Sequence, residues 1–167
     1  MTAIESHSRN DADLMKVIFR LEESDWHSHA TESMWARSEG TNRFRLENIP
    51  FYVYGVSYGD LVTTVIEEGQ HFFQGVSERG GHSTYRVFLT EEASEERFDE
   101  YSSALRSLGC TYERATDYLI ALDVPLEADI YKAYDALERG MSAEVWDFEE
   151  GHCGHRLKMR QERHFCG

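Results

Sequence analysis

The sequence predicts an α+β protein in which a small antiparallel β-rich N-terminal half packs on a ferredoxin-like (βαββαβ) C-terminal half. Up to Leu89, apolar residues mostly alternate with polar ones, which is the period of a β-strand. The spacing then changes to three and four at Phe98, Tyr101, Leu105 and Leu108, which is typical of one helix face. With 167 residues, of which 41% are hydrophobic, the chain is long enough to bury a core.

The N-terminal half, residues 14–79, is expected to form a twisted antiparallel sheet or a small barrel. Its alternating segments predict strands at 14–21, 32–37, 43–47, 61–67 and 71–78. Turn residues at 39–42 (EGTN) and 68–69 (EG) predict two hairpins. We expect the aromatic residues of this half to form the core between the two halves: Phe51, Tyr52, Tyr54, Phe72 and Phe73.

The C-terminal half, residues 84–150, predicts the order strand, helix, strand, strand, helix, strand. The strands are expected at 84–89, 110–114, 117–123 and 143–148. Gly109 follows the first helix as a C′ glycine, and Asp129 can cap a second helix that is expected to stop at Gly140. This order of elements is the split βαβ arrangement. Residues 151–167 are expected to form a basic tail that contains His and Cys.

The charge of the chain excludes some classes of partner. It carries 31 acidic against 17 basic residues, a net charge of −14. Nucleic acids and anionic membranes are disfavoured, because both are bound through Lys and Arg. No apolar run approaches the roughly 20 residues that cross a bilayer. The first residues are polar, and the three cysteines have no framework spacing, so a cytoplasmic location is expected.

Three stretches in this order resemble a bacterial family, domain of unknown function 4265. They are residues 48–51 (NIPF) with 55–60 (GVSYGD), then 81–87 (GHSTYRV), then 146–152 (WDFEEGH). The resemblance covers roughly residues 14–152, and it implies an architecture but no activity. The acidic C-terminal half is also weakly similar to the protein regulators of ribonuclease E activity, which are small acidic inhibitors.

Two local patterns could carry chemistry, and each has a structural explanation that we favour. Asp60, His82 and Ser83 form a candidate ligand site, although a tight turn with a hydrogen-bonded histidine explains the same residues. The stretch 55–60 is no nucleophile elbow, since a strand rather than a helix follows it. The tail holds soft ligands whose spacing matches no standard zinc finger: His152, Cys153, His155, His164 and Cys166. We therefore expect no metal, no other cofactor and no catalytic residue.

The acidic residues predict a surface that binds a basic protein. The expected partner-binding residues are those of the first helix region and of a turn after the last strand: Glu91, Glu92, Glu95, Glu96, Asp99, Glu149 and Glu150. The sequence thus favours a non-enzymatic, immunity-type or regulatory inhibitor of a basic bacterial toxin or enzyme. The alternative is a small-molecule-binding protein or accessory modifying enzyme that uses the junction around His82, Ser83 and Asp60.

Overall fold

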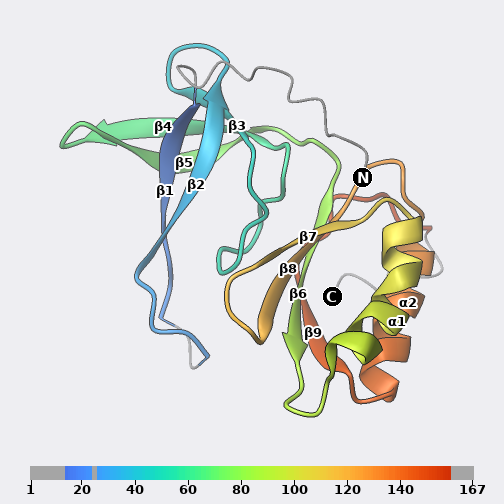
Figure 1. The fold of residues 1–167 in the computed structure, drawn as a ribbon. Helices are drawn as coiled ribbons and strands as arrows, with labels where there is room; N and C mark the ends of the chain where they lie inside the picture. The colour runs from blue at the N-terminus through green and yellow to red at the C-terminus, as the bar shows by residue number, and fades with distance from the viewer. Residues whose placement is uncertain (1–13, 24–25, 159–167) are drawn as a thin grey trace, which may run out of the picture.

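The computed structural model describes residues 14–23 and 26–158, which form two halves (Figure 1). In the N-terminal half the strands close into a barrel: β1 (Leu14–Arg20), β2 (Thr31–Ser38), β3 (Arg43–Leu46), β4 (Leu61–Glu67) and β5 (Gln70–Glu78). Strands that follow one another pair antiparallel, and β1 closes the barrel by pairing parallel to β5. The alternation in β1 puts Val17 and Phe19 inside the barrel, where both are buried.

The C-terminal half is a sheet covered on one face by two helices (Figure 1). Its elements are β6 (Ser83–Leu89), α1 (Glu95–Ser107), β7 (Thr111–Arg114), β8 (Leu119–Val124), α2 (Ile130–Ser142) and β9 (Trp146–His152). The strands lie in the order β7-β8-β6-β9, and all neighbours are antiparallel. The described residues therefore form a mixed α+β fold, mostly of strands. Neither helix is long and apolar enough to cross a membrane.

Capping residues that can be recognised in the sequence fix the ends of the helices. Asp129 accepts hydrogen bonds from the backbone N–H groups of Tyr131 and Lys132, so it caps α2 as predicted. Ser94 caps α1 in the same way. Gly109, directly after the C-cap of α1, has a φ of +90°, a conformation that L side chains rarely adopt. Both helices bury one face against the sheet.

The last strand lies further along the chain than the sequence predicts. It was expected at 143–148, but β9 spans Trp146–His152, because α2 continues past Gly140 to Ser142. A Cβ atom on Gly140 would lie 2.1 Å from the ring of Trp146. The glycine therefore allows the helix to approach β9 closely, and does not end the helix. As a result, Glu149 and Glu150 lie within a strand and not in a turn, and the predicted boundary at 150/151 falls inside β9.

Candidate functional site

The loop between β3 and β4 joins the barrel to the open face of the sheet. On the barrel side, the Glu32 carboxylate accepts hydrogen bonds from the backbone N–H groups of Phe51 at 2.7 Å and of Tyr52 and Val53 at 3.0 Å. On the sheet side, Arg86 donates from Nε to the Phe51 carbonyl at 2.8 Å and from Nη2 to the Val53 carbonyl. In this turn of the loop, the backbone N–H groups thus donate to the Glu32 carboxylate, and the backbone carbonyls accept from the Arg86 guanidinium.

Arg86 is fully buried, and burial lowers its pKa. The nearby carboxylates of Glu32 and Glu149 and the hydroxyl of Tyr54 oppose this shift. The Tyr54 ring covers the guanidinium at 4.8 Å, and its hydroxyl donates to Glu149 at 2.7 Å. Tyr54 is nevertheless 52% exposed, so the prediction that it lies in the core between the halves is wrong. This cluster is built as a joint between the halves, with Arg86 at its centre.

The three residues of the predicted ligand site lie at the end of this joint. Asp60 is 1% exposed, and its carboxylate accepts hydrogen bonds from the backbone N–H groups of Ser57 at 3.0 Å and Gly80 at 2.8 Å. It also forms an ion pair with Arg79 at 3.1 Å. Asp60 therefore ties the 55–60 turn to the chain that enters β6, which is the structural role that its turn position indicated.

His82 and Ser83 are engaged with different partners. The Nδ1 atom of His82 lies 2.9 Å from the carboxylate of Asp123, and this hydrogen bond raises the pKa of His82. The Ser83 hydroxyl is fully buried, lies 2.6 Å from Nδ1 of His155 and accepts a bond from the Gly154 N–H. His155 also bonds the Pro125 carbonyl through Nε2 at 2.9 Å, so it bridges the chain after β9 to the chain after β8.

The residues after β9 pack on this junction as far as the structure describes them. The Nε2 atom of His152, the last residue of β9, lies 3.4 Å from Nη1 of Arg79. Burial lowers the pKa of His152. The sulfur of Cys153 lies 3.8 Å from the His155 carbonyl. His164 and Cys166, the other predicted soft ligands, lie outside the described residues. Within the described part of the chain, no three His, Cys, Asp or Glu side chains are grouped closely enough to hold a metal ion.

The predicted partner-binding acids lie in the region of α1 and in β9. Glu91, Glu92, Glu95, Glu96 and Asp99 are all exposed, as expected. Glu95 forms an ion pair with Arg114 at 3.5 Å, and Asp99 forms one with Arg106 at 3.7 Å.

The prediction that Glu149 and Glu150 lie in a turn is wrong, because both lie within β9. Successive residues of a strand point to opposite faces of the sheet. Glu149 faces the barrel and bonds Tyr54. Glu150 points to the helix side, where its Oε1 atom is buried and has no hydrogen-bond partner in the part of the chain that the structure describes. Burial raises the pKa of Glu150.

Exposed acids instead gather where three loops meet at one end of the sheet, the lower end in Figure 1. The loops are joined by hydrogen bonds from Leu89 N–H to the Tyr118 carbonyl at 2.7 Å and from Thr90 N–H to the Val145 carbonyl at 3.1 Å. The acids on these loops and on the adjoining ends of α1 and β9 are all exposed: Glu91, Glu92, Glu95, Glu96, Asp117, Glu144 and Asp147. We call this set the acidic end.

An aromatic hollow of about 330 Å³ borders the acidic end, between the sheet and the loop that follows β1. Trp26, Tyr52 and Phe88 form its walls, and its rim includes Thr116 and Tyr118 on either side of Asp117. Trp26 is 37% exposed and Tyr118 is 57% exposed. Local sequence patterns do not predict this hollow, because its walls come from segments that are far apart in the chain.

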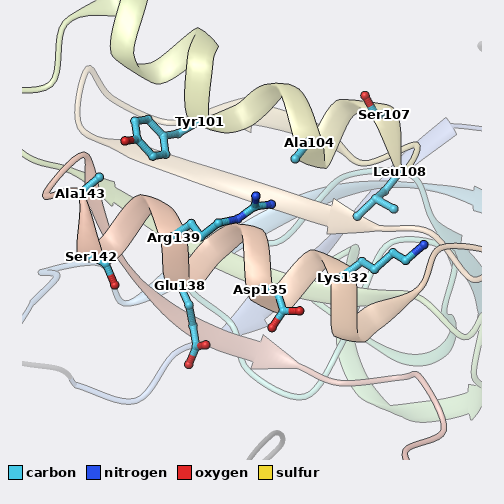
Figure 2. Close-up of a pocket in the computed structure, with 10 residues that line it drawn as sticks. All are labelled: Tyr101, Ala104, Ser107, Leu108, Lys132, Asp135, Glu138, Arg139, Ser142 and Ala143. Atoms are coloured by element: carbon cyan, nitrogen blue, oxygen red, sulfur yellow. The ribbon is translucent and has the colours of Figure 1, made fainter.

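Figure 2 shows a second hollow, an open groove of about 1060 Å³ between α1 and α2. Tyr101 and Ala104 of α1 line one side. The charged residues of the α2 side carry both signs, two basic and two acidic: Lys132, Asp135, Glu138 and Arg139. Such a lining favours neither an anionic nor a cationic ligand, so the groove indicates no ligand class.

One solved structure has a similar fold. A solved structure described as a hypothetical protein from Neisseria gonorrhoeae superimposes with a TM-score of 0.73 and 14% identity, over 84% of this chain and 96% of that chain. At this identity the likeness concerns the fold alone.

The family follows from the sequence profile described as a domain of unknown function (DUF4265), which matches residues 32–148. The chain belongs to the DUF4265 family, as its motifs predicted. No curated protein matches it.

Proposed function

We propose that this protein is a non-enzymatic acidic binding protein that neutralises a basic bacterial toxin or enzyme, as an immunity-type or regulatory inhibitor does. The observation that carries the proposal is the acidic end together with the exposed aromatic residues beside it. Charge attracts an oppositely charged protein over a distance, whereas affinity depends on a few desolvated anchors, among which Trp and Tyr are frequent. Asp117 and Tyr118 offer both properties in neighbouring residues.

The net charge of the chain supports the same partner. A protein with a net charge of −14 repels other acidic molecules and attracts basic ones at a rate that falls as salt screens the field. A basic partner would be attracted mainly to one end of the sheet, since Glu91, Glu92 and Asp117 lie on adjoining loops there.

We further infer that the C-terminal half is ferredoxin-like. The strand order β7-β8-β6-β9, with antiparallel neighbours and both helices on one face, supports this inference. A cytoplasmic location stays a prediction from the sequence. The acidic C-terminal half also supports the analogy with small acidic inhibitors of ribonuclease E, although an analogy of fold does not identify a target.

The test is co-expression with the proteins encoded by neighbouring genes, followed by co-purification and a toxicity rescue assay. Glu91→Lys with Asp117→Lys should weaken co-purification and rescue, and should slow association most at low salt. The matched control is Glu68→Lys with Glu78→Lys, which changes the net charge equally on the barrel. The proposal fails if no neighbouring protein co-purifies, or if both double variants bind equally well.

The alternative, a ligand site at Asp60, His82 and Ser83, has less support. Asp60 and Ser83 are buried, and their hydrogen bonds connect segments of this chain. His82 is the most accessible of the three, with 19% of its side chain exposed. A small metabolite that raises the melting temperature of the wild type but not of His82→Gln would favour this alternative over the inhibitor.

A further inference from the structure

We propose that the aromatic hollow receives an arginine side chain of the basic partner, and this proposal rests on the proposed function. The hollow lies between the two halves and opens beside the acidic end, where a protein drawn by charge would make its first contact. Its walls and the carboxylates beside its rim both match a guanidinium group.

The walls are aromatic rings that meet at different angles. The Trp26 ring lies 5.4 Å from that of Tyr52 at 36° and 5.4 Å from that of Phe88 at 87°. His29, which also lines the hollow, stacks on Tyr52 at 4.4 Å and so helps to fix that wall. A planar cation is attracted to aromatic faces, and Trp is the most favourable of them. Arginine is preferred over lysine here, because its guanidinium is flat and more weakly hydrated.

None of the lining residues is acidic, but carboxylates stand beside the rim, and the pairing of strands in the sheet explains one of them. Phe88 of β6 pairs with Leu119 of β8 on one side and with Asp147 of β9 on the other. Directly paired residues of antiparallel strands point to the same face of the sheet, so Asp147 stands next to the Phe88 ring. Asp117 stands in the chain between Thr116 and Tyr118, which line the hollow on the side of the β7–β8 turn. A cation seated against the rings therefore lies near carboxylates that stand beside the hollow.

Among the described residues, the lining of the hollow contains no arginine or lysine. Arg114, on the adjoining strand β7, forms an ion pair with Glu95 and lies 5.0 Å from the ring of Phe98 on the helix side of the sheet. In our proposal, the cation that complements the hollow comes from another molecule. The proposed function supplies it in the form of a basic protein.

The test uses the full chain labelled with ¹⁵N and the blocked amino acid N-acetyl-arginine methylamide as the probe. The indole N–H signals are assigned with Trp→Phe variants and followed during the titration. We expect a saturable shift of the Trp26 signal in the millimolar range. Trp146, which is buried and donates to the Leu137 carbonyl, should not respond. Trp35, 46% exposed on the barrel, reports non-specific stacking. The neutral isostere, N-acetyl-citrulline methylamide, should bind at least about tenfold more weakly, since it lacks the charge that the rings and the carboxylates beside the rim attract.

Two variants test the residues that form the site. Phe88→Leu removes a ring face while keeping an apolar side chain, and Asp147→Asn removes a charge beside the rim while keeping the size of the side chain. Each should weaken arginine binding by about threefold or more, in line with the loss of one cation–π contact or one ion pair. The matched control is Tyr112→Leu, which removes a ring that is 37% exposed and packs on Phe98 on the helix side of the sheet.

The proposal is overturned if Trp26 does not respond to the arginine probe, if citrulline binds equally well, or if Tyr112→Leu weakens binding as much as Phe88→Leu. This titration needs no partner protein, so its result is independent of the charge-reversal test. If the hollow binds arginine and no partner co-purifies, the proposed function fails alone. If a partner co-purifies and the hollow does not bind arginine, only the present proposal fails.

Discussion

Arg86 is the residue on which the contact between the two halves depends. A fully buried guanidinium would be costly to fold without partners, and Glu32, the loop carbonyls and the Tyr54 ring supply them. Its remaining Nη1 atom has no hydrogen-bond partner among the described residues and lies against Gly151 of β9. A Cβ atom at position 151 would lie 1.8 Å from Nη1 and 2.8 Å from Cζ. The glycine is therefore required by the arginine across the sheet.

Gly151→Ala should lower the free energy of unfolding by about 1–3 kcal/mol, because Arg86 is held at two other atoms and cannot simply move aside. Denaturant unfolding measures the change. Gly75→Ala in the barrel is the control, since its Cβ would meet only Thr63 Oγ1 at 3.9 Å, an ordinary contact. Equal stabilities of the two variants would show that Arg86 is not fixed as described.

His82 should make stability depend on pH. Its hydrogen bond to Asp123 raises its pKa above the ordinary value of 6.5, so the folded protein holds this proton more tightly than the unfolded chain. This stabilisation is complete below pH 6.5 and is lost as the pH rises through the raised pKa. His152, whose pKa is lowered by burial, has the opposite sign: it favours the folded state above pH 6.5 and loses that contribution as the pH falls.

The difference in unfolding free energy between wild type and His82→Gln isolates the first effect, since His152 is common to both proteins. We expect this difference to be larger at about pH 6 than at about pH 8. Denaturant titrations at both pH values measure it. A difference that stays constant, or that grows with pH, would contradict the His82–Asp123 ion pair.

At the scale of elements, α2 and β9 illustrate which signals a sequence carries. The Asp129 cap is local, so it could be predicted. The end of the same helix could not, because Gly140 serves a contact with the ring of Trp146 and not a helix stop. Because the helix ends later than predicted, β9 also begins later, at Trp146. Glu149 and Glu150 therefore lie on opposite faces of a strand and not in an acidic turn.

Trp146→Ala should lower the free energy of unfolding by about 3–5 kcal/mol, because Trp146 is 2% exposed and fills the space between β9 and both helices. Its indole N–H also donates to the Leu137 carbonyl at 2.9 Å. Trp35→Ala removes an equally large ring that is 46% exposed on the barrel, and should cost far less. Similar costs for the two substitutions would mean that β9 does not close the sheet through this contact.

At the scale of the whole molecule, the two halves share a polar and buried interface. Gly55 N–H donates to the Gly151 carbonyl at 3.0 Å, and the hydroxyls of Ser57 and Thr84 lie 2.6 Å apart, fully buried. Opening this interface would leave several buried polar groups without partners, at about 1–3 kcal/mol for each. The halves should therefore unfold together.

Single-tryptophan variants test that expectation, with Trp35 reporting on the barrel and Trp146 on the helix-covered sheet. Because the two variants lack different tryptophans, their stabilities differ, and the comparison is made within each variant. In each of them, the fluorescence transition in denaturant should have the same midpoint and slope as the circular dichroism transition, which reports on the entire chain. Different midpoints by the two probes in one variant would show that the barrel and the sheet are independent domains.

The sequence by itself determined the family, the α+β class, the acidic character and most element positions, because periodicity, caps and turn residues are local properties of the chain. The tertiary structure decided which residues meet. Asp60 and Ser83 became parts of a joint, and Glu149 and Glu150 separated to opposite faces. Asp147 came to stand beside Phe88, because strand register places residues of distant segments on one face. Such neighbours depend on pairing between strands, which local sequence patterns do not encode.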